Sequence, residues 1–193
     1  MKKTSIFTLA LLIVLTVGCK NEKKETEQKV EEPITEKVEQ TSNVEVIKFS
    51  LEPKSDSNVS GTVTFTQENG SVTMVAEMEG LTEGIHAIHI HEKADCSSPD
   101  GKSTGGHWNP TAQPHGKWGA EEGYHKGDIG NFIADASGKG SITFTTDQWC
   151  IGCGDEAKDI LGKAVIVHAG TDDYTTQPTG DAGGRISCAG IIK

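Results

Sequence analysis

The chain has 193 residues, 34% of them hydrophobic, which is enough for one domain with a substantial core and too little for two. Its formal net charge is −10, and this acidity argues against nucleic acid and against anionic lipid headgroups as partners. The composition therefore predicts one acidic domain with appendages.

The N-terminal segment has the organisation of a secretory signal peptide. Two lysines precede an apolar run, 6–17, that is too short to cross a membrane as a helix. The run ends in LTVGC, which resembles a bacterial lipobox with Gly18 directly before Cys19. We therefore predict a lipoprotein-type signal peptide over 1–18 and a lipid anchor on Cys19. The protein is then exported to the periplasm or cell envelope and held on a membrane by its N-terminal lipid.

The next segment, 20–43, is rich in Lys, Glu, Gln and Thr and contains no aromatic residue. Such a segment cannot bury enough apolar surface to offset the entropy lost on ordering. We expect 19–43 to be a flexible tether between the lipidated Cys19 and a folded domain over 44–193. Loss of the signal peptide removes two lysines, so the formal charge moves from −10 to −12.

From residue 44 onward, short β-branched or alternating apolar stretches are separated by Gly, Asn, Asp and Pro clusters. This texture predicts strands near 44–52, 59–67, 71–79, 84–91, 129–135, 140–146, 163–169 and 184–192. Eight short strands without an amphipathic helix predict an all-β fold, an eight-stranded antiparallel sandwich or barrel. Two connections, 92–128 and 170–183, are much longer than hairpin loops, which is typical of functional loops.

Three of the seven histidines lie in the single stretch GIHAIHIHE, residues 84–92. Side chains alternate between the two faces of a strand, so His89 and His91 share one face and can bind one ion together. His86 faces the other way, on the side of Ile88 and Ile90. We therefore interpret His86 as a hydrogen-bonded structural residue.

The other four histidines follow in the long loop and at the end of a later strand. They lie in GGHWNP, QPHG, HKGD and VIVHAG, and the third of these motifs also contributes an aspartate. An excess of imidazoles suits copper, whereas a mixed set of imidazoles and a carboxylate suits tetrahedral zinc. Because one ion cannot use all of these ligands, the pattern predicts two metal sites.

The series GIHAIHIHE, GGHWNP, PHG, HKGDIGN, VIVHAG and GGRISCAG resembles the copper/zinc superoxide dismutases in order and spacing, over about residues 44–193. The resemblance implies a Greek-key β-barrel that binds one copper and one zinc per subunit. It also implies dismutation of the superoxide anion to O2 and hydrogen peroxide at a redox-cycling copper, which would protect the cell envelope. The oligomeric state stays open, with a homodimer among the alternatives.

Carried over residue by residue, the resemblance implies a role for each matching position. Copper would be held by His89, His91, His107 and His168, and zinc by His107, His115, His125 and Asp128. His107 would bridge the two ions as an imidazolate and carry a proton to the product. Arg185 would hold the substrate anion beside copper, and Asp172 would orient one ligand of each metal.

Four cysteines remain after the lipidated one, namely Cys96, Cys150, Cys153 and Cys188. In an exported protein an even set predicts disulfides, and the residues alone leave three connectivities. The resemblance implies a Cys96–Cys188 bond. Cys150 and Cys153, in WCIGCG, lie outside the family pattern, and we expect a local disulfide there, with an auxiliary metal or redox role as the alternative.

One departure from the family pattern concerns the last long loop, because residues 170–184 contain no Lys or Arg and three aspartates. Guidance of the anion would then have to come from the other loop, through Lys93, Lys102, Lys117 or Lys126.

Two other functions are alternatives to the enzyme, and each fits the sequence less well. A copper or zinc carrier at the envelope would need no cation such as Arg185 beside the copper. A cupin-type barrel enzyme would leave the later histidines idle.

Overall fold

Residues 43–193, which are the part of the chain described by this computed structural model, form a closed antiparallel barrel of eight strands. The strands are β1 (Glu45–Pro53), β2 (Ser60–Glu68), β3 (Ser71–Glu79), β4 (Gly84–His91), β5 (Gly130–Ala134), β6 (Gly140–Thr146), β7 (Ala164–His168) and β8 (Arg185–Gly190). Within this range the one helix is the 3-10 turn η1 (Lys102–Thr104). No helix of the described residues is long and apolar enough to span a membrane. The predicted all-β, eight-stranded fold is confirmed, with strand boundaries within two residues of those expected.

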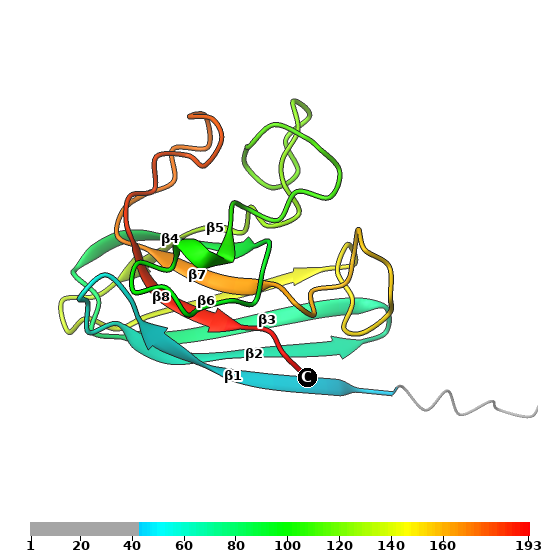
Figure 1. The fold of residues 1–193 in the computed structure, drawn as a ribbon, viewed down its shortest axis with the longest axis horizontal. Helices are drawn as coiled ribbons and strands as arrows, with labels where there is room; N and C mark the ends of the chain where they lie inside the picture. Colours follow the sequence, from blue (N-terminus) through cyan, green and yellow to red (C-terminus); the bar gives the residue numbers. More distant parts are fainter. Residues whose placement is uncertain (1–42) are drawn as a thin grey trace, which may run out of the picture. The chain divides into compact units, whose positions relative to one another are not determined.

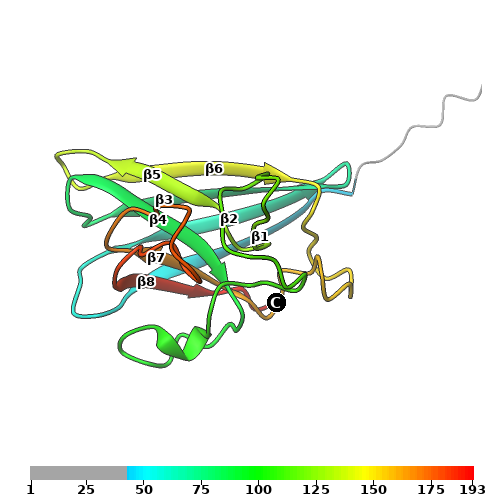
Figure 2. The same ribbon diagram turned by 90° about the horizontal axis from the view of Figure 1, so that it is seen from above.

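The strands follow one another around the barrel in the order β1-β2-β3-β6-β5-β4-β7-β8 (Figures 1 and 2). The β2–β3 hairpin closes through Asn69 and Gly70, both with positive φ, which is the backbone that a tight two-residue turn between twisted strands requires. β3 pairs with β6 and not with β4, and β5 and β4 then follow β6 around the barrel, which is a Greek-key order. This order places β4 between β5 and β7, and β4 carries the histidine pair.

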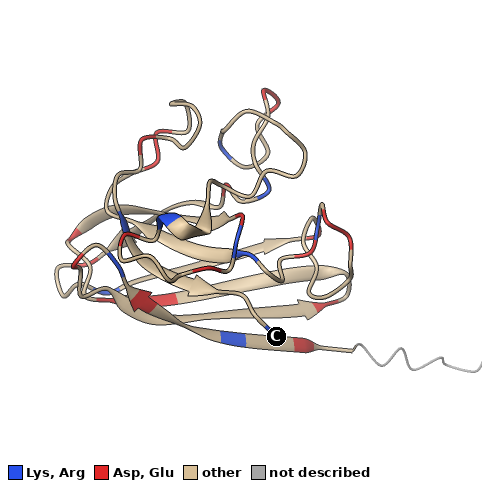
Figure 3. Cartoon of the chain, in the orientation of Figure 1, with Lys and Arg blue, Asp and Glu red and all other residues tan. Residues whose placement is uncertain are grey.

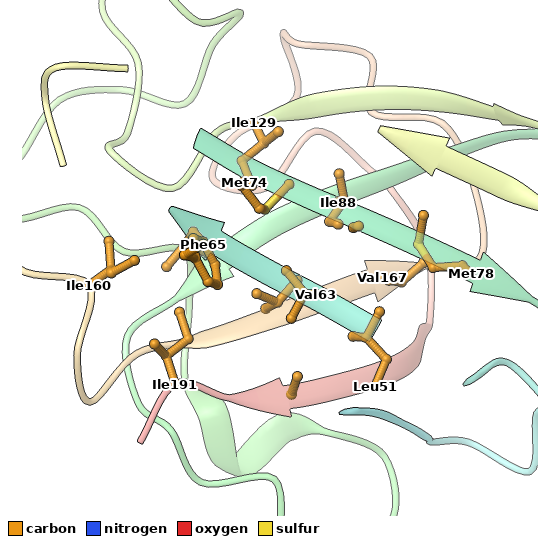
Figure 4. Packing of buried hydrophobic residues seen from close by; sticks show 14 of the residues in the cluster. Leu51, Val63, Phe65, Met74, Met78, Ile88, Ile129, Ile160, Val167 and Ile191 are labelled. Carbon is orange, nitrogen blue, oxygen red and sulfur yellow. The ribbon is translucent and has the colours of Figure 1, made fainter. Parts of the chain in front are cut away.

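The barrel interior is filled by the alternate residues of its strands (Figure 4). In β3 the inward residues Val72, Met74, Ala76 and Met78 are buried while their neighbours are not. In contrast, every residue of β7 is buried, and β4 is buried from His86 to His91. These two strands are therefore covered on both faces, by the core inside the barrel and by loops outside it.

Three long connections leave the barrel, 92–129, 147–163 and 169–184. We predicted only the first and the last to be long, so the β6–β7 connection is an addition to that prediction. The first and last rise from the same side of the barrel (Figure 1), while η1 lies on the β8 side (Figure 2). Trp149 ties the middle loop to the first, because its indole N–H donates to the carbonyl oxygen of Lys126 at 2.8 Å.

The predicted signal peptide, 1–18, and the predicted lipid anchor, Cys19, lie outside the described residues. So does all but the last residue of the predicted tether, 19–43.

Candidate metal centre

Six of the seven histidines, all except His86, converge where the outer face of β4 meets the first and last loops. Strand alternation brings His89 and His91 to this outer face. His168 is the last residue of the neighbouring β7, and His107 reaches the same place because the first loop pairs it with His91 in an isolated antiparallel bridge. The structure thus brings together four buried imidazoles from three segments of the chain.

The first cluster consists of His89, His91, His107 and His168, with one ligand atom from each within 4.8 Å of the others. The Nε2 atoms of His91 and His168 are 3.4 Å apart. The ring centroids of His89 and His107 lie 4.0 Å apart. Four converging imidazoles without a carboxylate are the ligand set that suits copper in tetragonal nitrogen coordination.

The second cluster consists of His107, His115, His125 and Asp128, again within 4.8 Å. The Nδ1 atoms of the three histidines lie 2.8, 3.0 and 3.1 Å from the carboxylate oxygens of Asp128. A tetrahedral zinc ion with bonds of about 2.0–2.1 Å holds its ligand atoms roughly 3.3 Å apart. The three nitrogens therefore lie nearly as far from the Asp128 carboxylate as a tetrahedral ion would hold them.

Two buried ring nitrogens in these clusters, Nδ1 of His89 and Nε2 of His107, have no hydrogen-bond partner, and two more, Nδ1 of His115 and Nδ1 of His125, approach Asp128 as ion pairs without forming a well-aligned hydrogen bond. An unsatisfied buried polar atom costs about 1–3 kcal/mol, so a group of such nitrogens in one place is an arrangement that a bound cation would stabilise. Each of the four faces one of the two clusters, and a metal ion there would satisfy it. The residues present therefore fit two metal ions.

His107 is shared by the two clusters. Its Nδ1 lies 2.8 Å from an oxygen of Asp128, in the second cluster, which leaves the unpartnered Nε2 for the first. A single imidazole with one nitrogen in each cluster is the geometry of a bridging ligand.

Hydrogen bonds to the remaining nitrogens orient the rings. Asp172 accepts from Nε2 of His89 at 2.8 Å with one oxygen and from Nε2 of His115 at 2.9 Å with the other, so one carboxylate links a residue of each cluster. Nδ1 of His91 donates to the carbonyl oxygen of Gly105 at 3.0 Å. Such outer partners fix which nitrogen of a histidine is free to bind metal.

His86 lies on the opposite face of β4, stacked on Phe132. Its Nδ1 is 2.9 Å from the carbonyl oxygen of His168, and its Nε2 is 3.2 Å from the hydroxyl of Thr82. Nε2 also lies 2.9 Å from the backbone carbonyl oxygen of Thr82, so Thr82 contacts the ring through both its hydroxyl and its carbonyl oxygen. His86 is thus a buried structural residue, as predicted, and it also supports the backbone of a cluster histidine.

The buried environment shifts the pKa values of the cluster in two directions. Burial lowers the pKa of His91 and of His168 well below the ordinary value, and nearby imidazoles lower it further. Burial likewise lowers the pKa of His107 to about 4, which favours the neutral ring that binds metal. At His115 burial also opposes the charged form, but the interactions with two buried carboxylates, those of Asp128 and Asp172, prevail and raise the pKa to about 9. Those carboxylates favour positive charge there, from a proton or from a metal ion.

A cavity of about 320 Å³ opens beside the first cluster and is lined by His91, His168 and Arg185. The Arg185 guanidinium is held by the first loop, because its Nη1 donates to the carbonyl oxygen of Gly101 at 2.9 Å and to Oγ1 of Thr104 at 3.0 Å. This cation faces the same cavity as two cluster histidines and can hold a small anion there. A larger cavity, about 760 Å³, contains no cluster histidine and lies by the middle loop.

Three charged residues, Asp100, Lys102 and Arg185, line the cavity beside the first cluster. Figure 3 shows the charged positions along the whole described part of the chain. Among the four lysines proposed as guides, Lys102 lines the cavity, and its Nζ lies 3.0 Å from a carboxylate oxygen of Asp100. The last loop, 169–184, contributes only acidic charges to this side. Among the residues that line this cavity, the Lys and Arg side chains therefore come from β8, through Arg185, and from the first loop, through Lys102.

Both predicted cysteine pairs are bonded, Cys96 to Cys188 and Cys150 to Cys153. The first bond joins Cys96, near the start of the first loop, to Cys188 in β8, three residues after Arg185. The second lies in the middle loop, where Asp159 accepts hydrogen bonds from the backbone N–H groups of Gly152 and Gly154. Because the two sulfurs are bonded to each other, this group, with Asp159, would offer thiolate ligands to an ion only after reduction.

Two residues that support the centre were missed by sequence reasoning. Asn131, on β5, pairs its side-chain amide with both backbone groups of Asp172, at 2.9 Å each. Gln177 does the same for His115. An isolated amide side chain carries no periodicity or ligand chemistry, so neither residue had a signal in the sequence.

Comparison with known proteins agrees with this geometry. The model of the copper/zinc superoxide dismutase family matches residues 59–191. A protein named superoxide dismutase [Cu-Zn] from Caulobacter vibrioides is 38% identical over 142 residues, which cover 72% of this chain and 80% of that protein. A crystal structure of a SOD-like protein from Bacillus subtilis has a TM-score of 0.66 and 28% identity, covering 75% of this chain and 97% of that one. A double mutant of such a protein from the same organism has a TM-score of 0.67 and 30% identity, covering 76% and 97%.

Proposed function

The chain belongs to the copper/zinc superoxide dismutase family, and from this we propose that copper occupies the first cluster and zinc the second, in an enzyme that removes superoxide at the cell envelope. The family and the named relative support an oxidoreductase that dismutes superoxide, with copper and zinc as cofactors. The observation that carries the assignment is His107, which presents one nitrogen to a four-imidazole cluster and the other to a cluster containing a carboxylate. Those two ligand sets suit copper and zinc respectively.

When bound, copper supplies the electron exchange by which one superoxide is oxidised to O2 and a second is reduced to hydrogen peroxide. The chain's own residues then have three tasks. Arg185 holds the anion in the cavity beside His91 and His168, where its charge opposes the acidity of the protein. Nε2 of His107 is the buried, unpartnered atom at which a proton can be held and passed to the product. Asp172 binds the rings of His89 and His115 with its two carboxylate oxygens and so fixes their orientations relative to each other. The geometry of the two clusters is linked in this way.

The test of this function is to purify the protein, measure copper and zinc per chain, and record superoxide decay on the same sample. We expect one copper and one zinc per chain and decay that scales with copper content. Full copper occupancy without dismutation would instead favour a metal carrier, since a carrier needs the clusters but not the anion site at Arg185.

We further propose that the protein is held at the cell envelope through a lipid on Cys19, on the evidence of the lysines, apolar run and LTVGC motif at the N-terminus. Replacing Cys19→Ser should move the protein from the membrane fraction to the soluble fraction of fractionated cells. A variant that stays in the membrane fraction would contradict lipid anchoring at this residue. The strand positions give no preference for a monomer or a dimer, and a homodimer remains the proposal to check by light scattering.

A further inference from the structure

Gln177, in the last loop, contacts the backbone of His115, in the first loop, 62 residues earlier in the chain. The side-chain Oε1 of Gln177 accepts from the backbone N–H of His115 at 2.9 Å. Its Nε2 donates to the carbonyl oxygen of the same residue at 2.8 Å. Both backbone groups of one cluster histidine are therefore held by a single side chain from another loop.

The ring of His115 is held by the same loop. Its Nε2 bonds to an oxygen of Asp172 at 2.9 Å, while its Nδ1 faces the second cluster, 3.0 Å from Asp128. Asp172 and Gln177 both belong to loop 169–184. This loop thus fixes the backbone of His115 through Gln177 and its ring through Asp172.

Gly180 shows how closely the last loop packs on this contact. A Cβ at Gly180 would lie 1.8 Å from Oδ1 of Asp172 and 2.6 Å from Nε2 of His115, and its φ of +70° is one that side chains rarely adopt. Its N–H donates to the carbonyl oxygen of Thr176 at 2.7 Å, which closes a turn containing Gln177. The loop backbone therefore lies directly over the His115–Asp172 hydrogen bond, with Gln177 at its edge.

We propose that Gln177 is a positioning residue that latches loop 169–184 onto His115 and thereby slows the loss of zinc from the second cluster. The proposal rests on the assignment of zinc to that cluster. For zinc to leave, His115 must move away from Asp128, and Gln177 resists this movement by holding both backbone groups of His115. Coupling of this kind is reciprocal, so zinc binding should also hold the loop against His115.

The test is the rate at which zinc leaves the fully loaded protein in an excess of a chromogenic zinc chelator. We expect Gln177→Ala to speed zinc release about tenfold, the effect of removing two hydrogen bonds of ordinary strength. Gln177→Glu should fall between the wild type and Gln177→Ala, because a carboxylate can still accept from His115 N–H but cannot donate to its carbonyl oxygen. The matched control is Gln113→Ala in the first loop, whose amide donates only to the carbonyl oxygen of nearby Thr111, at 3.3 Å, and whose loss should leave the rate unchanged.

Hydrogen exchange gives a second readout, which a general loss of stability would not reproduce. Zinc should slow exchange of the His115 amide in the wild type and in Gln113→Ala, and this zinc effect should shrink in Gln177→Ala. Equal rates of zinc release from the wild type and from Gln177→Ala would contradict the proposal that Gln177 latches the loop onto His115. Equal falls in melting temperature for the zinc-free and zinc-loaded forms of Gln177→Ala would also overturn it. A wild-type protein that takes up no zinc would overturn the zinc assignment itself, and the latch with it.

Discussion

Replacing His89→Ala should abolish copper binding and lower copper-dependent superoxide decay by more than about 100-fold, since removal of even an outer partner of a ligand costs about 10–100-fold. His89 is fully buried, with Nδ1 facing the first cluster and Nε2 bonded to Asp172. Its loss would remove one ligand and one of the two anchors of the carboxylate that links the clusters. The measurements are copper per chain and the rate of superoxide decay.

The matched control is His86→Ala on the other face of the same strand. This variant should keep its copper, because His86 offers no atom to either cluster. It should instead lose about 2–4 kcal/mol of unfolding free energy, from a buried cavity and the hydrogen bonds to His168 and Thr82. Copper retained at full occupancy in His89→Ala, or lost in His86→Ala, would contradict the division of β4 into a metal face and a core face.

Removing the Cys96–Cys188 disulfide, with serine at both positions, should lower the unfolding free energy by about 4–5 kcal/mol in the chain-entropy model. The two cysteines are 92 residues apart, so the bond closes a long loop that contains β5, β6 and β7 and strongly restricts the unfolded chain. Urea unfolding measures the change. Double serine replacement of Cys150 and Cys153 is the control, because those residues are 3 apart and the same model gives about 2 kcal/mol or less.

The same disulfide also affects the substrate cavity. It joins the start of the first loop to β8, and that loop supplies the Gly101 and Thr104 oxygens that hold the Arg185 guanidinium. The variant should therefore lose superoxide-decay rate per bound copper as well as stability. Equal stability losses in the two double variants would show that loop length is not the source of the stabilisation.

The strands could be predicted because their signals are local. Alternation of apolar and polar residues, as in β3, and breakers such as Asn69-Gly70 act within a few residues of chain, and the eight predicted strands match those observed. The division of β4 into a histidine-pair face and a face carrying His86 follows from the same alternation. The β6–β7 connection was not predicted as a long loop, although the predicted strands 140–146 and 163–169 leave a long stretch of chain between them.

The residues around the metal centre show where local signals end. Gln177 and Asn131 each pair with both backbone groups of a distant residue, and such contacts depend on where loops return in space. Nothing in the neighbouring residues distinguishes Gln177 from Gln113, yet only Gln177 reaches His115. The cysteines are a similar case, since their residues alone allowed three connectivities and the fold selects one.

The amino-acid sequence by itself determined the all-β class, the face of β4 that carries His89 and His91, and the chemical types of ligand available. Strand periodicity and side-chain chemistry are properties of neighbouring residues, so they can be known before folding. The family resemblance already implied that His107 is shared by both clusters and that Asp172 orients one ligand of each, and the tertiary structure brings these residues together accordingly. Only the tertiary structure decided that Gln177 and Asn131 hold the backbones of His115 and Asp172. Those features arise because barrel closure brings residues from distant parts of the chain within hydrogen-bonding distance.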